Sequence, residues 1–411
     1  MSRALRVCGF LLTATHALAA QQPAAPKLFF GFTLIDGTDR PPVPNAAMVL
    51  RDGRIVAAGP LTSISIPVGA ERVSLAGKFV MPGLVNAHGH VSAMADLSTY
   101  AAYGVTSVFS LGSEPAEVIA ARAEQSRPDL ARARVWVAGP VLNPRTVDEA
   151  RTQVDGVAAQ RTDIVKTRVD DNLGTTAKIA PDVVAAMIDQ AHRQKMRMAV
   201  HLFYLADAKS VLAAGADYIA HSVRDTEVDA ELIGALKSRN VCLSPTLMRE
   251  VSTFVYESTP DFFTDPLFLA HANKARITTL LEPARQQAMR SSPSAQRYKV
   301  ALEMASKNLK KLSDAGVMIA MGTDTGPMGR FQGYFELMEL ELMVKAGLTP
   351  KQALVAASRD AARCMKIDGE VGTLTPGKWA DFVALDADPL SNISNVRNIS
   401  GVWVAGNRLP R

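Results

Sequence analysis

The sequence predicts an α/β fold, a parallel (β/α)8 TIM barrel in the middle of the chain with a small β-sandwich domain built from both chain ends. Two observations predict this fold. Eight short apolar segments recur through the middle, and helical patterns fall between most of them. Both chain ends instead alternate apolar and polar residues between turns that contain glycine, which is typical of antiparallel strands.

The barrel is expected to span residues 81–372. Amphipathic helices are expected between its strands, for example at 181–194 and 227–239. A phenylalanine-rich stretch at about 249–300 is expected as an insertion after the seventh strand. It could be a lid or a wall of the active site, or else a packed decoration or an oligomer contact. The eight predicted strands are 80–86, 105–110, 134–139, 163–168, 197–202, 217–222, 241–245 and 317–322.

The β-sandwich domain is expected to combine residues 28–80 with residues 373–411. Near the start, LFFGFTLIDG and AAMVLRDGRIVAAG alternate around Asp-Gly turns, and GTLTPGKWADFVALD and ISGVWVAGNRL do the same near the end. Because the two patterns match and flank the α/β part, we expect them to form one domain.

Composition excludes some classes of protein. The 411 residues are 48% hydrophobic and 21% charged, which are ordinary values for a globular protein and exclude a disordered chain. The formal net charge of +5 is modest, and no block of lysine and arginine appears. A nucleic-acid partner is therefore not expected.

Residues 1–20 resemble a secretory signal peptide. MSRALR supplies basic residues, VCGFLLTATHALA is apolar, and small residues near Ala19 and Ala20 provide a cleavage site. The apolar stretch is too short to be a stable membrane anchor. A periplasmic or secreted protein is expected. Cys242 and Cys364 remain after cleavage, and two buried free thiols are favoured over a disulfide, although the compartment permits one.

Polar residues at the ends of the predicted strands point to a metal site. His88 and His90 are two residues apart, so a strand would direct both imidazoles to the same face. The alternative is a hydrogen-bonded pair of polar residues at a strand end. Four of the seven histidines follow this pattern, and the full set at the strand ends is His88, His90, Lys166, His201, His221 and Asp324. If the barrel is correct, all six lie at one rim.

Lys166 lies inside an apolar strand, where a buried ammonium is costly unless it is paired. A salt bridge to a carboxylate, or a stem that reaches out to solvent, would satisfy it. The favoured interpretation is that its neutral amine reacts with carbon dioxide. The resulting carbamate is an anion that can bridge two divalent cations.

These motifs resemble the amidohydrolase superfamily of metal-dependent hydrolases. The resemblance rests on FVMPGLVNAHGH, the single Lys166, the single His201 and His221, IAMGTDTG with Asp324 in it, and the C-terminal GTLTPGKWADFVALDADPL. It covers essentially the whole mature chain. Within the superfamily, the sequence is most similar to the imidazolonepropionase-like branch that includes Xaa-Pro dipeptidases.

The resemblance implies two divalent metal ions, with zinc the expected ion. It places the more buried ion on His88, His90, Asp324 and carbamylated Lys166, and the more exposed ion on His201, His221 and the same carbamate. It implies a metal-bridging hydroxide as the nucleophile. Asp324 is then expected to carry the proton to the leaving amine. Relatives are often homo-oligomers, so the resemblance also implies an oligomer.

The expected activity is hydrolysis of an amide in a small peptide-like or N-acyl amino acid substrate. Tyr204 and Arg224 each follow a histidine ligand by three residues, so Tyr204 could stabilise an oxyanion and Arg224 could bind a substrate carboxylate. Simple wall packing is the alternative for Tyr204, and a pair with Asp225 or Glu227 is the alternative for Arg224. Arg330 is a weaker candidate for substrate binding.

Dipeptide specificity itself is not carried over. The dipeptidase-like relatives have a loop with glycine and histidine after the third strand, and AGPVLNPRTVDEA lacks it.

Other functions stay open. A mononuclear cyclic-amide hydrolase or deaminase could use the same barrel, although deaminases usually carry a glutamate where this chain has Tyr204. A lactone or a phosphotriester could also be the substrate. A periplasmic binding protein without catalysis is disfavoured, because a binder does not need six converging polar groups.

Overall fold

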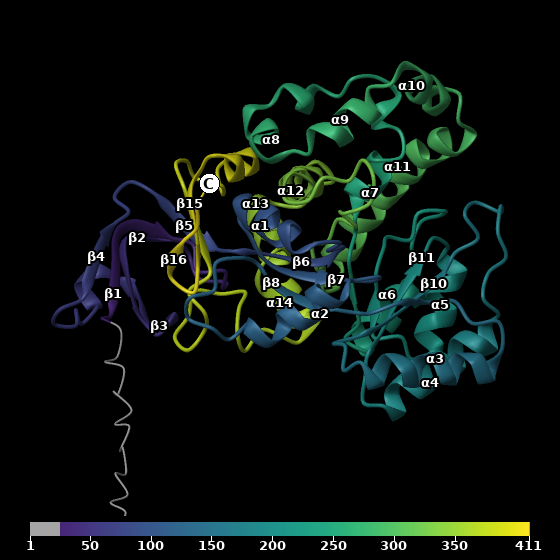
Figure 1. Cartoon of the computed structure of the whole chain (residues 1–411), viewed down its shortest axis with the longest axis horizontal. Coiled ribbons are helices and arrows are strands. Elements are labelled where there is room, and N and C mark those ends of the chain that lie inside the picture. Colours follow the sequence, from purple (N-terminus) through teal and green to yellow (C-terminus); the bar gives the residue numbers. More distant parts are fainter. Residues whose placement is uncertain (1–24, 411) are drawn as a thin grey trace, which may run out of the picture.

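The computed structural model describes residues 25–410, so the predicted signal peptide lies outside the described residues. The described strands form three sheets, which lie side by side along the longest axis of the molecule (Figure 1). The sheet made from the chain ends is at the left of the view, and the strands and helices of the middle of the chain fill the centre and right.

Strands from both ends of the chain form one mixed sheet. Its order is β16-β15-β14-β5-β1-β2-β3, with β4 paired to β1. The two ends meet where β5 and β14 pair antiparallel, with Pro82 opposite Phe382. The strands are β1 (Lys27–Leu34), β2 (Val43–Arg51), β3 (Arg54–Pro60), β4 (Glu71–Ser74), β5 (Phe79–Pro82), β14 (Phe382–Leu385), β15 (Ile399–Val404) and β16 (Asn407–Arg408).

This sheet is one hydrogen-bonded unit, not the two separate sheets of the expected sandwich. The reason is that β1 changes its neighbour along its length: Lys27–Phe30 pair with β4, and Thr33–Leu34 pair with β5. Between them Gly31 has a φ of +85°, which a glycine adopts without strain. Because β1 changes partner, it connects strands that the sequence pattern had assigned to two separate layers.

The middle of the chain holds parallel strands in two sheets. One has the order β6-β7-β8 and the other β13-β12-β11-β10-β9. These strands are β6 (Leu84–Gly89), β7 (Val105–Ser110), β8 (Arg134–Val137), β9 (Val141–Leu142), β10 (Val165–Val169), β11 (Met198–Leu202), β12 (Tyr218–Ile219) and β13 (Cys242–Leu243). The prediction for 105–110 is confirmed in full. The prediction for 80–86 is wrong at its start, because Gly83 separates β5 of the terminal sheet from β6.

The eighth predicted strand, 317–322, is not a regular strand. Two isolated parallel bridges, Leu243 with Ile319 and Gly89 with Thr325, connect this part of the chain to β13 and to β6. Across residues 25–410 the two parallel sheets are therefore joined by isolated bridges and not by a continuous ladder. The segment approaches β6 closely, because a Cβ on Gly322 would lie 2.8 Å from the Cβ of His88.

Helices follow most of the parallel strands, and local signals set where several begin. Thr146 accepts a hydrogen bond from the backbone N–H of Glu149, Asp229 does the same for Leu232, and Pro181 opens α4. The helices are α1 (Met94–Ala102), α2 (Ala116–Ala121), α3 (Val147–Ala159), α4 (Pro181–Arg193), α5 (Leu205–Ala214), α6 (Ala230–Ser238), α7 (Leu247–Val251), α8 (Pro266–His271), α9 (Lys274–Leu280), α10 (Pro283–Arg290), α11 (Pro293–Asp314), α12 (Tyr334–Lys345), α13 (Pro350–Ala356) and α14 (Arg359–Met365).

The insertion is a packed helical layer. In Figure 1, α8, α9 and α10 form a green layer at the top, outside α12 and α7. Phe268 is fully buried, and its ring lies 4.8 Å from that of Phe331 and 5.0 Å from that of Tyr334, between ring centroids. Of the alternatives left open by the sequence, these aromatic residues support a packed decoration, because their rings contact one another and α12.

Cys242 and Cys364 form a disulfide, so the prediction of two free thiols is wrong. Their Cα atoms lie 5.9 Å apart across a sequence separation of 122 residues. The pairing depends on α14 packing beside β13, which the local sequence around each cysteine does not encode. Among the described residues, no helix is both long and apolar enough to cross a membrane.

Candidate metal centre

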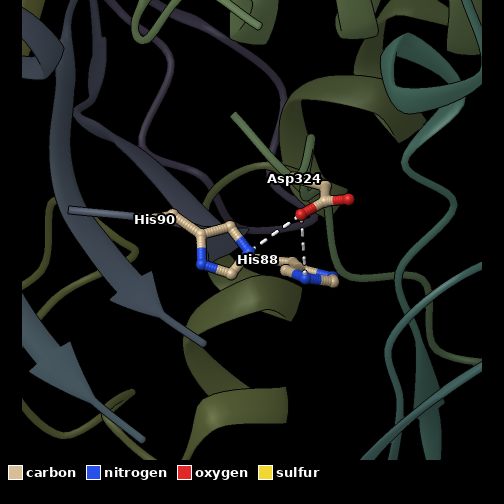
Figure 2. A group of neighbouring side chains, drawn as sticks. All are labelled: His88, His90 and Asp324. Carbon is tan, nitrogen blue, oxygen red and sulfur yellow. Dashed lines mark hydrogen bonds and ion pairs between the residues drawn. The ribbon is translucent and has the colours of Figure 1, made fainter. Parts of the chain in front are cut away.

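His88, His90 and Asp324 meet at one point (Figure 2). His88 lies in β6, His90 follows it, and Asp324 comes from the segment that bridges to β6. The Asp324 Oδ1 atom lies 2.8 Å from Nε2 of His90 and 3.6 Å from Nε2 of His88. One nitrogen or oxygen atom from each residue falls within 4.8 Å of the others, which makes this group a candidate metal site.

Backbone carbonyls fix both histidine rings. Nδ1 of His88 lies 2.7 Å from the Ala220 oxygen, and Nδ1 of His90 lies 3.2 Å from the Gly112 oxygen. With the proton on Nδ1, each Nε2 would present a lone pair to a metal ion, whereas a proton on Nε2 of His90 is donated to Oδ1 of Asp324 at 2.8 Å. Burial, followed by the charge of Lys166, holds the pKa of His88 well below its usual value, so this ring is neutral and able to bind a metal.

Asp324 reaches this position through an unusual backbone conformation. Its φ is +57°, in the left-handed region, and its backbone N–H donates to the His88 oxygen at 2.7 Å. The Arg330 guanidinium contacts Oδ2 of Asp324, on the side away from the histidines. Burial would raise the pKa of Asp324, but Arg330 and the hydrogen bond to His90 outweigh it and hold the pKa well below its usual value.

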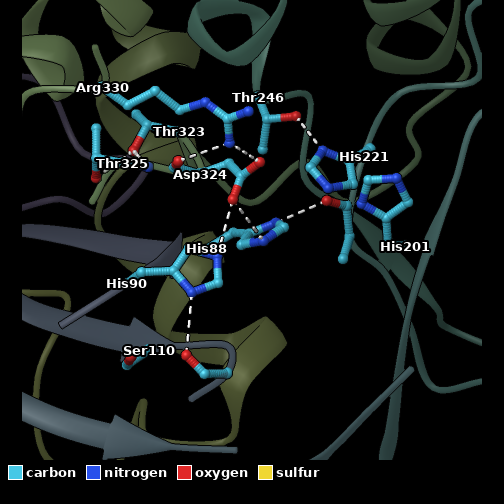
Figure 3. Close-up of polar contacts among 12 residues, drawn as sticks. His88, His90, Ser110, His201, His221, Thr246, Thr323, Asp324, Thr325 and Arg330 are labelled. Atoms are coloured by element: carbon cyan, nitrogen blue, oxygen red, sulfur yellow. Dashed lines mark hydrogen bonds and ion pairs between the residues drawn. The ribbon is translucent and has the colours of Figure 1, made fainter. Parts of the chain in front are cut away.

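Two further histidines lie beside this group (Figure 3). The ring centroids of His221 and His88 are 4.6 Å apart, and those of His201 and His221 are 4.1 Å apart. Nδ1 of His221 lies 2.7 Å from the Thr246 hydroxyl, while its buried Nε2 has no hydrogen-bond partner within residues 25–410. Nε2 of His201 lies 2.7 Å from Asp170, which leaves Nδ1 for another ligand, and burial lowers the pKa of His201 to about 3.

Lys166 is buried near these histidines. It is 3% exposed, and its Nζ has no hydrogen-bond partner among the residues that the structure describes. Burial lowers its pKa to about 7. Its charge also lowers the pKa values of His88, His201 and His221, which places the amine near all three rings. Neither the salt bridge nor the solvent-exposed stem considered for this lysine is present.

The structure thus brings all six predicted ligands into one neighbourhood. Two of them, Lys166 Nζ and His221 Nε2, are buried polar atoms without a partner in the described chain. Leaving such atoms unsatisfied costs about 1–3 kcal/mol each, so a native site is expected to supply partners for them. This donor set, made of imidazole nitrogens, a carboxylate and a neutral amine, fits divalent metal binding.

The three predicted substrate contacts occupy different environments. The Tyr204 hydroxyl donates to Asp171 at 2.8 Å, and burial together with this carboxylate raises the tyrosine pKa to about 12. Arg330 contacts Asp324, as described above. Arg224 is 2% exposed and donates to the backbone oxygens of Leu202 and Ser222.

The sequence suggested a pair of Arg224 with Asp225 or Glu227, and this prediction is wrong. Its Nε lies 3.0 Å from Oε1 of Glu250, a buried residue on α7. Oε2 of Glu250 in turn lies 3.0 Å from Nη1 of Arg249. Two guanidinium groups therefore share one carboxylate, and Nη2 of Arg224 has no hydrogen-bond partner in the described part of the chain.

Sequence reasoning missed several residues that orient the ligands. Asp170 holds His201 and Thr246 holds His221. Thr246 directly follows the predicted strand 241–245 and Asp170 lies two residues past the predicted strand 163–168, so the criterion that selected the candidate ligands would have found both. Glu250 gave a weaker signal, because nothing in the local sequence shows that this glutamate is buried.

Comparison with known proteins gives a consistent assignment. The amidohydrolase family matches residues 79–409, which is most of the chain. An imidazolonepropionase from Streptomyces coelicolor is 24% identical over 390 residues, covering 89% of this chain and 92% of that protein. An ochratoxinase from Aspergillus niger is 25% identical over 283 residues, covering 66% of this chain. The matched region spans about half of that relative, 51% of its length.

A solved structure has the same fold over nearly the whole chain. It is a Bifidobacterium longum protein provisionally assigned as a prolidase, with a TM-score of 0.76, 25% sequence identity and 95% of each chain covered. A Xaa-Pro dipeptidase with bound methionine has a TM-score of 0.74 at 20% identity, covering 94% of this chain and 100% of that one, and at this identity it shows the fold alone.

Proposed function

Because the chain belongs to the amidohydrolase family, a family of hydrolases, we propose that it is a binuclear metal-dependent hydrolase of C–N bonds. The proposed substrate is a small peptide-like or N-acyl amino acid amide. One observation carries the proposal: four imidazoles, one carboxylate and one buried lysine without a partner among the described residues lie close together.

In this proposal each ligand has a defined task. His88, His90 and Asp324 hold one ion, and His201 and His221 hold the other. Lys166, carbamylated by carbon dioxide, lies between the two groups, as its electrostatic effect on histidines of both groups supports. Zinc fits the nitrogen and oxygen donors. When bound, such ions polarise a carbonyl group and lower the pKa of water, which supplies the nucleophile.

Asp324 is the proposed proton carrier. Its Oδ1 faces the two histidines, while Arg330 occupies the other side of the carboxylate. Because Arg330 favours the ionised form, Asp324 is able to accept a proton at neutral pH. The same residue then donates that proton to the leaving amine. Arg330 therefore acts on Asp324 in this structure and not as the substrate contact expected from the sequence.

Substrate recognition is proposed to involve a carboxylate. Arg224 and Arg249 share the single carboxylate of Glu250, and Nη2 of Arg224 is a buried donor without a hydrogen-bond partner among the described residues. Such a donor is costly to leave unsatisfied, and an anionic group would satisfy it best. Peptides and N-acyl amino acids with a free carboxylate supply one. Tyr204 would need to leave Asp171 to stabilise an oxyanion.

The two parallel sheets are proposed to be arcs of one (β/α)8 barrel, spanning residues 81–372. The isolated bridges on both sides of the segment 317–325 support this view. Residues 28–80 and 373–411 would then form the second domain. Export to the periplasm or beyond the cell is also proposed, and the Cys242–Cys364 disulfide supports an oxidising compartment.

A second candidate is hydrolysis of a cyclic amide at a single metal ion. The similarity to an imidazolonepropionase over 89% of this chain favours it. It makes a different prediction about Lys166, which would remain an unmodified amine and would not bridge two ions.

Metal content distinguishes the two candidates. The protein is expressed with added zinc and bicarbonate, and metal per chain is measured by elemental analysis. About two ions per chain, with hydrolysis of N-acyl amino acids or Xaa-Pro dipeptides, is the expected result. About one ion per chain, with ring opening of an imidazolone and no cleavage of linear amides, would replace the proposal with the second candidate.

A further inference from the structure

Helix α12 carries two buried glutamates in an otherwise largely apolar sequence, YFELMELELMVK. Glu336 and Glu339 are both 0% exposed and lie one helical turn apart. Buried carboxylates are expensive unless other groups satisfy them, so their partners matter. Neither glutamate belongs to the ligand set, and neither forms an ion pair with a described residue.

Glu336 contacts the chain beside all three members of the His88, His90 and Asp324 group. Its Oε1 accepts hydrogen bonds from Asn86 at 2.6 Å and from the hydroxyls of Thr323 and Thr325 at 2.7 Å each. Thr323 and Thr325 flank Asp324, whose left-handed backbone conformation they therefore hold.

The same carboxylate reaches the two histidines through one more residue each. Oδ1 of Asn86 accepts the backbone N–H of His88 at 2.9 Å. Thr325, in turn, accepts the backbone N–H of His90 on its backbone oxygen at 2.8 Å. A single oxygen atom of Glu336 is thus connected to the backbone of every residue in the group.

Glu339 supports the other histidine pair in a different way. Its Oε1 and Oε2 each accept one backbone N–H, from Leu247 and Met248, at 2.7 Å. These residues directly follow Thr246, which has a φ of +49° although it is β-branched, a costly conformation. Thr246 is the residue whose hydroxyl binds Nδ1 of His221.

We propose that Glu336 and Glu339 are positioning residues that hold the two left-handed turns of the site, at Asp324 and at Thr246, in ligand geometry. One helix thereby fixes both halves of the metal centre relative to each other. The proposal rests on the proposed metal site but not on any substrate, because it concerns the geometry of the ligands alone.

The two glutamates differ in how well a glutamine could replace them. Glu336 uses only Oε1, and its Oε2 has no partner among residues 25–410, so Glu336→Gln keeps every acceptor that is in use. Glu339 uses both oxygens, so Glu339→Gln places an N–H donor against a backbone N–H. Glu341→Gln is a matched control on the same helix, because Glu341 pairs with Arg397 away from the site.

The test measures zinc affinity of metal-depleted protein by competition with a coloured chelator, in bicarbonate buffer, together with the cobalt(II) absorption spectrum. Glu339→Gln is expected to weaken zinc binding by about 10- to 100-fold and to change the cobalt spectrum, as is typical when residues that orient ligands are altered. Glu336→Gln and Glu341→Gln are expected to stay within about threefold of wild type. Glu336→Leu, which leaves three donors unsatisfied, is expected to weaken binding like Glu339→Gln.

The proposal is overturned if folded Glu339→Gln and Glu336→Leu bind zinc like wild type. It is equally overturned if zinc affinity in all four variants, Glu341→Gln included, merely follows their melting temperatures, since that pattern indicates a purely structural role. A wild-type protein that binds zinc but cleaves no amide would refute the proposed function and leave this inference standing, because the measurement contains no substrate.

Discussion

Replacing Glu336 with glutamine should change how the stability of the metal-free protein depends on pH. Burial raises the pKa of Glu336 from its ordinary value of 4.5 to about 7. The folded state therefore keeps the proton on this carboxyl over a pH range in which the unfolded state has released it. Its contribution to stability is present at low pH and is lost as the pH rises through about 7, the reverse of a carboxylate in a salt bridge.

The size of the effect follows from the same values. One pKa unit corresponds to about 1.4 kcal/mol, so the complete loss is at most about 3.5 kcal/mol of the free energy of unfolding. Most of this loss, about 2.5 kcal/mol, falls between about pH 5 and pH 8. Glutamine resembles the protonated carboxyl and does not titrate. The variant should match wild type near the acid end and exceed its stability at pH 8.

Denaturant unfolding of both proteins across this pH range, followed by tryptophan fluorescence and with a chelator present, measures the difference. Tyr100 and Glu339 are the titratable groups whose pKa values Glu336 itself raises, and both remain in the variant. Because these two groups are present in both proteins, the stability of the variant is compared with that of wild type at each pH. Parallel curves for the two proteins would refute the reasoning, because they would mean that Glu336 binds no additional proton in the folded state.

Three further predictions concern the site and the disulfide. Asp324→Asn should keep metal but lose about 10²- to 10⁴-fold in turnover, measured by steady-state kinetics beside metal analysis; turnover like wild type would exclude Asp324 as the proton carrier. Lys166→Ala should lose metal and activity, with partial recovery when a short carboxylic acid is added, and full zinc occupancy without the acid would count against a bridging carbamate. Replacing both Cys242 and Cys364 with alanine should lower the free energy of unfolding by up to about 5 kcal/mol, from the loop of 122 residues that the disulfide closes; an unchanged denaturation midpoint under oxidising conditions would contradict this.

The sequence predicted well which polar side chains lie together, because strand ends obey local rules. The two-residue spacing of His88 and His90 is enough to place both rings on one side of the chain. The segment 317–322, which leads to Asp324, was expected as a regular strand, and this part of the prediction failed. The close approach of Gly322 to His88 and the left-handed conformation of Asp324 depend on contacts between segments more than 200 residues apart in sequence.

Long-range pairs account for the other differences. Cys242 and Cys364 each resemble a buried free thiol in their own segment, and only the packing of α14 against β13 joins them. Arg224 has acidic neighbours in sequence, yet its partner is Glu250 on α7, beyond α6 and β13. In both cases tertiary packing determines the partner, and the local sequence pattern does not contain that information.

The pairing of β5 with β14 has a consequence for the order in which the protein acquires its structure. Only Gly83 separates β5 from β6, the strand that carries His88, and β5 pairs with residues 382–385. The strand next to His88 can therefore pair with its partner only after almost the whole chain has been synthesised. Contacts of such large sequence separation form slowly, because the entropic cost of closing a long loop comes before the stabilisation that the contacts provide. Ribosome-bound chains that lack the last strands should thus contain the ligand residues without an assembled metal centre.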